Sequence, residues 1–367
     1  MGGHEPWFEI SPAKFPHRRC ARLPGTLEVR CFHRCQRCRR QHLRPGSTRH
    51  EVCNHTVSTD FLVSCCGRRL HLAVPDSNRY IQAIRRLKAE GKKLMRTVHL
   101  MFVPDEEVGG HKGMETFVKH PEFQKLNIGF ALDEGLANPG EAYTVFYGER
   151  NPWWITVHCP GSPGHGSRFV ENTAAEKLHS IINSFLGFRE KEKQRLNTTK
   201  CFTLGDVTTV NMTMVKGGVA YNVIPAEMDV SFDLRIPPTV NLQEFEEQIK
   251  LWCEEAGEGI TYEFAQKHMS QGMTSTDDTD PWWNAFSITC KAMNMTLEKE
   301  IFPAATDSRF IREVGIPAIG FSPMHRTPIL LHDHNEYLNE QIFLQGINVY
   351  EKLIPALASV PALPDEP

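Results

Sequence analysis

The sequence predicts an α/β fold, and two patterns in it support that prediction. From residue 80 onward, short apolar segments alternate with amphipathic ones, as in βαβ units built on a largely parallel sheet. In the middle of this region the order becomes β-α-β-β-α-β, which is typical of a ferredoxin-like sandwich. The chain has 367 residues, 40% of them hydrophobic, which is enough for an α/β core with a second domain inserted into it.

The first elements of the core follow residue 80. Residues 80–91 predict a helix, because apolar side chains recur every third position and Gly91 follows as a stop. Residues 97–103 and 128–132 are apolar runs of strand length, and residues 112–120 between them have a helical pattern.

The inserted unit and the return to the core complete the expected layout. In the inserted unit we expect strands at 154–158, 207–215, 228–236 and 260–264, with helices at 173–195 and 242–256. The core then resumes with helices at 282–293 and 340–359 and strands at 297–302 and 318–321.

Charge and cysteine usage exclude several classes of protein. The net charge of −3 argues against nucleic acid as the main partner, and no apolar run is long enough for a membrane span. No secretory signal precedes the eleven cysteines, which indicates reduced thiols and a cytoplasmic protein. Residues 1–78 are different from the rest: the first 66 residues hold eleven basic against five acidic side chains, and no period of 2 or 3.6 is present. We expect residues 1–78 to be an aberrant, irregular segment.

Acidic and histidine-bearing turns follow the predicted strands. Glu106 and Glu107 follow the strand that ends at Val103, and Glu134 follows the next one. If these strands are neighbours, their carboxylates converge at one edge of the sheet, as a cation site requires. His332 follows another apolar run, and histidine is a common zinc ligand.

Further polar side chains fit a carboxylate-bearing substrate. His165 lies in the Gly-rich turn GSPGHGSR, and Asn222 lies in GGVAYNVIP. Arg235 ends FDLR and Arg309 ends AATDSR, and an arginine fork binds a carboxylate through two hydrogen bonds. Taken singly, each arginine is more often a surface charge.

These motifs together resemble a known family. VPDEEVGG, ALDEG, PGHGSR, GGVAYNVIP, FDLR, AATDSR, GFSP and LLHDH are similar, in order and spacing, to the co-catalytic zinc metallopeptidase superfamily, and most of all to its cytosolic aminoacylases. The resemblance covers residues 80–367. It implies a three-layer α/β/α catalytic domain (79–152 and 267–367) with an inserted ferredoxin-like dimerisation or lid domain (153–266). It also implies hydrolysis of N-acyl aliphatic L-amino acids by a homodimer.

The resemblance implies a role for each residue. Glu106 would be the general base, and Glu107, Glu134 and His332 would bind two Zn²⁺ ions. His165 would reach across the dimer interface to polarise the scissile carbonyl. The groups that hold the substrate would be Asn222, Arg235 and Arg309.

The N-terminal segment departs from the family pattern. The family has a His-x-Asp and a bridging Asp in its first half. Residues 1–79 contain no His-x-Asp, and they lack the Gly-x-x-Asp-Met-Lys segment expected before the first helix. Read one base out of frame, residues 14–29 and 45–57 become compatible with both motifs. We therefore interpret residues 7–57 as an out-of-frame translation, followed by an aberrant stretch over 58–78, and expect incomplete zinc binding and impaired activity.

Three other interpretations stay open. The first is an N-terminal zinc module, suggested by a group of cysteines and histidines, although only one good Cys-x2-Cys pair is present: Cys31, His33, Cys35, Cys38, His42, His50 and Cys53. The second is a non-catalytic relative that keeps the dimerising domain. The third is a dipeptidase or carboxypeptidase of the same superfamily.

Overall fold

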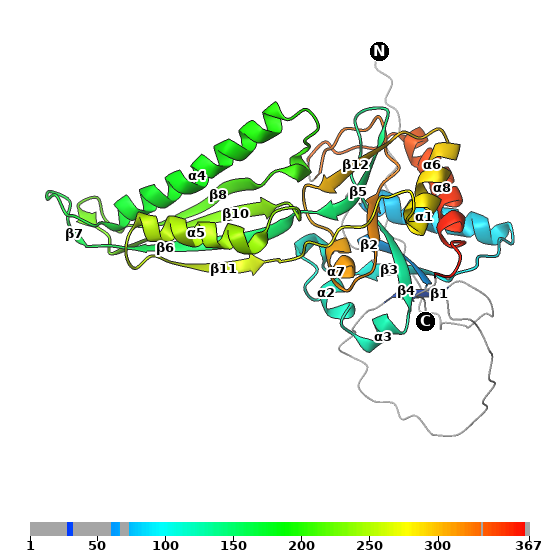
Figure 1. Ribbon diagram of the computed structural model, residues 1–367, viewed down its shortest axis with the longest axis horizontal. Coiled ribbons are helices and arrows are strands. Elements are labelled where there is room, and N and C mark those ends of the chain that lie inside the picture. Colours follow the sequence, from blue (N-terminus) through cyan, green and yellow to red (C-terminus); the bar gives the residue numbers. More distant parts are fainter. Residues whose placement is uncertain (1–27, 32–59, 67–72, 332, 364–367) are drawn as a thin grey trace, which may run out of the picture.

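The computed structural model describes residues 28–31, 60–66, 73–331 and 333–363. These residues form two main sheets, one of seven strands and one of four, and a small two-stranded sheet. Figure 1 shows the four-stranded sheet and its helices extending away from the seven-stranded sheet, with the small sheet β7–β9 at the far tip.

The seven-stranded sheet is mostly parallel and runs in the order β1-β3-β2-β4-β13-β5-β12. The one antiparallel pair is β13 with β5. Its strands are β1 (Glu28–Cys31), β2 (Asp60–Cys66), β3 (Val98–Val103), β4 (Ile128–Asp133), β5 (Tyr143–Glu149), β12 (Leu297–Phe302) and β13 (Ala318–Phe321).

Helices cover both faces of this sheet, which confirms the predicted α/β class. One face packs against the long helices α1 (Ala73–Ala89), α6 (Pro281–Ala292) and α8 (Glu340–Leu357). The other packs against α2 (Met114–Phe117), α3 (Pro121–Gln124) and α7 (Ser308–Glu313). Strand β4 shows why both faces are apolar: Phe130 and Leu132 point to the first layer, and Ala131 points to the second.

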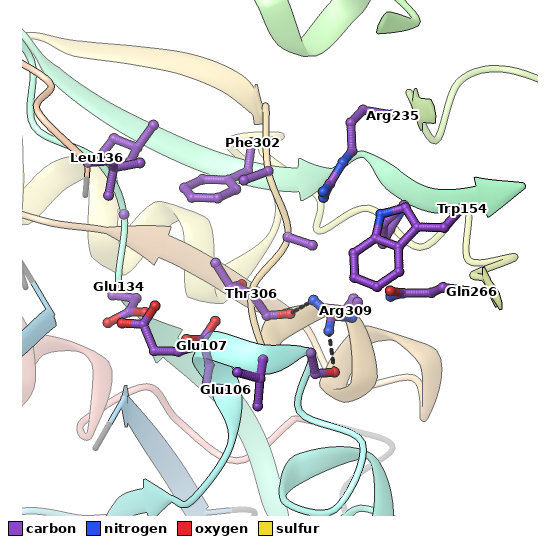
Figure 2. A pocket seen from close by; sticks show the side chains of 17 residues that line it. Glu106, Glu107, Glu134, Leu136, Trp154, Arg235, Gln266, Phe302, Thr306 and Arg309 are labelled. Carbon is purple, nitrogen blue, oxygen red and sulfur yellow. Dashed lines mark hydrogen bonds between the residues drawn. The ribbon is translucent and has the colours of Figure 1, made fainter. Parts of the chain in front are cut away.

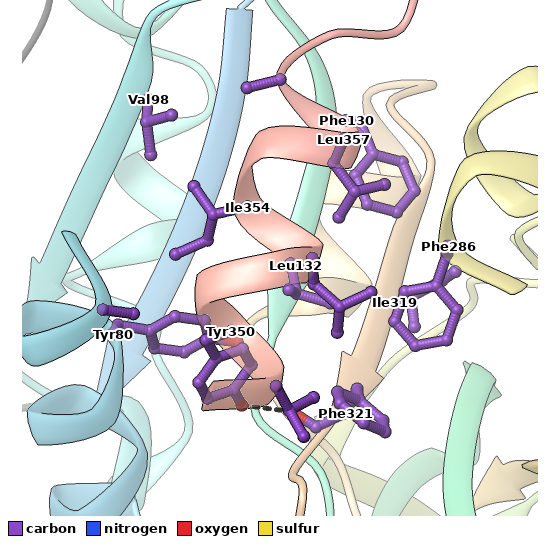
Figure 3. Packing of buried hydrophobic residues seen from close by; sticks show 14 of the residues in the cluster. Tyr80, Val98, Phe130, Leu132, Phe286, Ile319, Phe321, Tyr350, Ile354 and Leu357 are labelled. Atoms are coloured by element: carbon purple, nitrogen blue, oxygen red, sulfur yellow. Dashed lines mark hydrogen bonds between the residues drawn. The ribbon is translucent and has the colours of Figure 1, made fainter. Parts of the chain in front are cut away.

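The larger core lies between the sheet and the long helices (Figure 3). Tyr80 of α1 stacks on Tyr350 of α8, with ring centroids 3.9 Å apart. The Tyr350 hydroxyl donates to the carbonyl oxygen of Phe321 on β13, so a buried polar group is satisfied inside the apolar layer. This contact ties both helices to the centre of the sheet.

The four-stranded sheet has the predicted ferredoxin-like topology. Its order is β11-β6-β10-β8, all antiparallel, and α4 and α5 cover one face. The elements are β6 (Asn151–Pro160), α4 (Ala174–Thr198), β8 (Thr209–Gly217), β10 (Glu227–Ile236), α5 (Leu242–Ala256) and β11 (Thr261–Lys267), with β7 (Gly164–His165) and β9 (Val223–Ile224) at the tip and the 3-10 turn Leu204–Asp206 before β8.

Side-chain caps fix where the long helices begin. Thr173 and Glu176 form a reciprocal capping box at the start of α4. The side chains of Asn241, Asp280 and Asn339 accept from the first free N–H groups of α5, α6 and α8. Each cap lies within a residue or two of the predicted start, because Ser, Thr, Asp and Asn at this position are readable in sequence.

The N-terminal expectation needs correction where the structure describes this region. The expectation that residues 1–78 are irregular is wrong for β1 and β2, which pair with β3, and for the start of α1 at Ala73. Strand β2 also pairs with β4, so it lies inside the sheet. Residues 1–27, 32–59 and 67–72 lie outside the described residues, and with them most of the proposed out-of-frame stretch and zinc module.

Several further elements were not predicted, including the short helix α3 and the tip strands β7 and β9. Strand β5 and helix α7 fall in segments whose sequence pattern was too short or too mixed to assign. Within the described part of the chain, no helix is both long and apolar enough to cross a bilayer.

Replacing Phe286 by Ala tests the core of the seven-stranded layer. Phe286 is fully buried and packs edge-to-face on Phe321, with centroids 5.1 Å apart. We expect Phe286→Ala to lower the free energy of unfolding by about 3–5 kcal/mol, measured by urea denaturation. Ile288 lies on the same helix and is 57% exposed, so Ile288→Ala should change it by less than about 0.5 kcal/mol. Equal effects of the two changes would contradict this packing.

Candidate active site

A cavity of about 510 Å³ lies where the two sheets meet (Figure 2). Acidic side chains gather on one side of it and polar or cationic ones on the other. Its lining comes from the ends of β3 and β4, from β6, β10 and β11, and from the segment after β12; it comprises Glu106, Glu107, Val108, Gly109, Glu134, Gly135, Leu136, Pro152, Trp154, Arg235, Gln266, Phe302, Ala304, Ala305, Thr306, Arg309 and Leu331.

Short turns place the acidic side chains at the cavity. Glu106 and Glu107 open a 3-10 turn (Glu106–Val108), which Pro104 and Asp105 connect to the end of β3. Gly109 closes the turn with φ 106°, a conformation that favours glycine, and its N–H donates to the Glu106 carbonyl oxygen. Glu134 is the first residue after β4. Strands β3 and β4 are not neighbours, because β2 lies between them, yet both reach the same cavity.

The acidic side is electrostatically strained. Burial raises the pKa of Glu134 well above its ordinary value, and the carboxylates of Asp133 and Glu106 raise it further. Asp307, which is also buried, has a raised pKa for the same reasons: burial first, then Glu106 and Asp133. Crowded, buried carboxylates repel one another unless a proton or a cation lies among them.

One oxygen of Glu134 is suited to a cation. Its Oε2 atom is buried and has no hydrogen-bond partner among the described residues. A buried carboxylate oxygen without a donor is costly, so the arrangement fits a bound divalent metal ion. Glu107, on the same cavity wall, offers a second oxygen ligand.

The opposite side of the cavity carries positive charge. The Arg235 guanidinium is held by Asp233, with Nε and Nη2 2.7 and 2.9 Å from the two carboxylate oxygens. Arg150 Nη1 donates to Thr209 Oγ1 at 3.1 Å, and Thr209 lies opposite Arg235 on the neighbouring strand β8. Burial, and then the charge of Arg235, lower the pKa of the Arg150 guanidinium to about 10. The cavity therefore has an acidic pole and a cationic pole.

Arg309 fixes the wall between the two poles. Its Nη1 atom donates to the Thr306 carbonyl oxygen and its Nη2 atom to the Gly109 carbonyl oxygen, each at 2.8 Å. These bonds, drawn in Figure 2, join the segment after β12 to the turn that carries Glu106. Ser308 links the same part of the chain to the end of β4, because its hydroxyl donates to Asp133 Oδ2 at 2.7 Å.

The structure brings together five of the eight predicted site residues: Glu106, Glu107, Glu134, Arg235 and Arg309. It does not bring His165 and Asn222 to the cavity of the same chain. These two lie at the tip of the four-stranded sheet, where Asn222 Nδ2 is 3.4 Å from His165 Nε2 (Figure 1). His332 lies outside the described residues.

Sequence reasoning missed the apolar and amide lining of the cavity. Trp154, Gln266, Leu136 and Phe302 all line it, and none belongs to a motif of charged residues. One signal was present: Trp154 stands on the face of β6 opposite to the buried Trp153, and an exposed tryptophan on a strand suggests a ligand contact.

A separate group of possible metal ligands lies outside the cavity. His158, Glu227 and Asp229 stand on the face of the four-stranded sheet that the helices leave open, with ligand atoms within 4.8 Å of one another. The Nδ1 atom of His158 is 2.8 Å from Asp229 Oδ1, so this pair is satisfied without an ion.

Comparisons with known proteins agree with this geometry. Residues 80–356, more than half of the chain, match the family model "Peptidase family M20/M25/M40". Aminoacylase-1A of Rattus norvegicus is 65% identical over 290 residues, and aminoacylase-1 of Homo sapiens is 62% identical over the same length; each match covers 79% of this chain and 71% of the relative. Aminoacylase-1 of Dictyostelium discoideum is 51% identical over 293 residues, covering 77% and 71%.

Solved structures share the fold at low sequence identity. The aminopeptidase PepT of Bacillus cereus has a TM-score of 0.63 at 13% identity, with 83% of each chain covered. The Bacillus subtilis YXEP protein, a dinuclear metal-binding peptidase of the M20 family, has a TM-score of 0.59 at 13% identity, with 83% of each chain covered. These likenesses confirm the predicted zinc-peptidase-like fold.

His268, next to the cavity wall, should make the free energy of unfolding depend on pH. Burial first, and then the charge of Arg309, lower its pKa to about 4, against an ordinary value of 6.5. Between these values the unfolded chain binds more protons, so the free energy of unfolding should fall as pH drops from 6.5 toward 4. We expect His268→Gln to remove on the order of 2 kcal/mol of this loss, measured by urea denaturation across that range. The matched control is His179→Gln on α4, because His179 is exposed and its replacement should leave this loss as it is in the unchanged chain. If the free energy of unfolding of His268→Gln fell with pH as steeply as that of the unchanged chain, the prediction would be contradicted.

Proposed function

The chain belongs to peptidase family M20/M25/M40, and we propose that it hydrolyses the amide bond of N-acyl L-amino acids, mainly N-acetyl amino acids with aliphatic side chains. The observation that carries the proposal is the two-pole cavity: carboxylates fit for a metal on one side, and arginine on the other. The relatives named aminoacylase-1 support the substrate class.

The cavity offers a separate place for each part of such a substrate. Arg235 and Arg309 would hold the carboxylate through charge-assisted hydrogen bonds. The aliphatic side chain would lie on the apolar lining, to which Leu136 and Phe302 contribute. The amide carbonyl then faces the acidic pole, where Glu106 and Glu134 lie.

Two Zn²⁺ ions are the proposed cofactor, held by Glu107, Glu134 and His332 among others. Bound zinc would polarise the amide carbonyl and lower the pKa of the attacking water. Glu106 would take a proton from that water and deliver it to the leaving nitrogen. The products are a free L-amino acid and a carboxylate, usually acetate.

A homodimer is part of the proposal. His165 and Asn222 lie at the tip of the four-stranded sheet, away from the cavity of their own chain, so they can act at a cavity only in a second copy. Strand β8 is an edge of that sheet and exposes apolar side chains there: Met212, Met214 and Val215 are 44–50% exposed. An exposed apolar edge strand favours pairing with another chain. We assign dimerisation to an inserted domain, residues 153–266.

A cytoplasmic location and reduced activity complete the proposal. Cys159, Cys201, Cys253 and Cys290 are free thiols, which fits a reducing compartment. Because residues 1–79 lack the family's first-half ligands in their usual context, we propose that this chain binds zinc incompletely and works below the rate of its relatives.

Zinc content and turnover of the full chain test the function directly. We expect the purified chain to hydrolyse N-acetyl-L-methionine slowly, to contain less than two Zn²⁺ ions, and to lose activity in chelator. Glu106→Gln should lower kcat by about 100-fold or more, since the general base is removed. The matched control is Glu141→Gln, because Glu141 is exposed and pairs with Arg326. Faster hydrolysis of dipeptides than of N-acetyl amino acids would replace the proposal by a peptidase, and no hydrolysis at all would favour a non-catalytic relative.

Mixing two inactive variants tests the shared site. Glu106→Gln and His165→Ala chains should each be inactive alone. After subunit exchange, one of the two cavities in each mixed dimer has an intact Glu106 and an intact partner histidine. About a quarter of wild-type activity should therefore return with random pairing of a two-fold dimer. No recovery, although mixed dimers are detected by mass, would place His165 outside the site.

A further inference from the structure

Asp233 connects two residues of the cavity lining without lining the cavity itself. Its Oδ1 atom accepts from Arg235 Nε at 2.7 Å, and its Oδ2 atom accepts from Arg235 Nη2 at 2.9 Å. The same Oδ2 also accepts from the indole Nε1 of Trp154 at 3.1 Å. One carboxylate thus holds a cationic side chain and an aromatic one.

The register of the four-stranded sheet makes this contact possible. Asp233 on β10 lies directly opposite Trp154 on β6. Arg235 is two residues further along β10, so its side chain emerges on the same face as that of Asp233. Figure 2 shows the Trp154 ring and the Arg235 guanidinium side by side across the cavity from the glutamates.

Charge explains why Arg235 needs this partner. Arg150 donates to Thr209, which lies opposite Arg235 in the sheet, and the charge of Arg235 contributes to the lowered pKa of Arg150. Asp233 opposes this effect, since its charge acts on Arg150 in the other direction. The two bonds to Asp233 use two of the five N–H donors of the Arg235 guanidinium, so a carboxylate ligand can still be bound by others.

We infer that Asp233 is a positioning residue that holds Arg235 and Trp154 as one unit, and that this unit selects ligands carrying a carboxylate next to an apolar side chain. The inference rests on the proposed function and deepens it, because it assigns carboxylate selection to a particular pair on the wall opposite the glutamates. Asp233 acts through Arg235 and does not touch the ligand.

An Asp233→Asn substitution breaks the unit at nearly constant volume. If the asparagine oxygen takes the place of Oδ2, its amide nitrogen faces the Nε–H donor of Arg235, and the two donors repel. If it takes the place of Oδ1, the amide nitrogen faces both Arg235 Nη2 and Trp154 Nε1. In either orientation the two-bond fork to Arg235 is lost.

Binding of a ligand pair separates positioning from charge. We would measure the Kd of N-acetyl-L-methionine and of its neutral primary amide by calorimetry, in a Glu106→Gln background so that no turnover occurs. Asp233→Asn should weaken the carboxylate ligand about tenfold, the usual effect of losing a hydrogen bond to a charged group, and the amide less than about twofold. Asp229→Asn is the matched control, because Asp229 lies on the same face of β10 and contacts His158 instead.

Trp154→Phe provides a second, milder variant. It keeps an apolar ring and removes only the Nε1–H donor, so carboxylate binding should weaken by less than in Asp233→Asn. In the Asp233→Asn background it should have little further effect on carboxylate binding, because the two-bond fork that positions Arg235 is already lost.

Three results would overturn the inference. The first is that Asp233→Asn weakens both ligands equally, and the second is that it binds the carboxylate ligand more tightly. The third is that the Glu106→Gln chain with Asp233 intact binds the amide as well as the carboxylate. The second would show that Asp233 only masks the charge of Arg235. Failure of the proposed function would look different from failure of the inference. The chain with Glu106 intact would then show no hydrolysis, but it would still prefer the carboxylate ligand, and this preference would still depend on Asp233.

Discussion

A buried ion pair between Glu149 and Arg312 holds the segment on which the cavity depends. Arg312 Nη1 donates to Glu149 Oε1 at 2.8 Å, and both side chains are about 5% exposed or less. The other oxygen of Glu149 accepts from the backbone N–H of Thr306. Thr306 in turn holds Arg309 through its carbonyl oxygen. A buried pair of this kind adds little net stability, but breaking it leaves an uncompensated charge, so it fixes one conformation of this segment.

Arg150, which follows Glu149 in the chain, connects the same segment to the four-stranded sheet. Glu149 ends β5, and Arg150 stands before β6, where the chain passes from one sheet to the other. The Arg150 guanidinium donates to the carbonyl oxygens of Pro303, from Nε at 2.8 Å, and of Val207, from Nη1 at 3.2 Å. Two adjacent charged residues thus tie the segment after β12 to both sheets, which sets the distance between the acidic and cationic poles.

Local sequence patterns were enough to predict most elements, but not their assembly. The bounds of α5, β12 and β13 matched because caps, glycines and apolar runs are local signals. The convergence of Glu106 and Glu134 was inferred from strand ends, although the intervening β2 was not foreseen in a segment without periodicity. The Asp233–Trp154 contact depends on register between two strands about eighty residues apart in the chain, and no local pattern encodes it. His165 showed the opposite case: its motif was recognised, but one chain does not place it at the cavity.

The position of β2 constrains the acidic pole most tightly. Neighbouring strands lie about 4.8 Å apart, so β3 and β4 are separated by roughly 10 Å with β2 between them. The carboxylates of Glu107 and Glu134 meet at one cavity because each follows its strand in a turn and carries a long side chain. The backbone pairing of β2 with both strands therefore sets the spacing of Glu107 and Glu134, the two carboxylates proposed to hold a metal ion. A change of register in Asp60–Cys66 would move the two carboxylates relative to each other even though it altered neither of them.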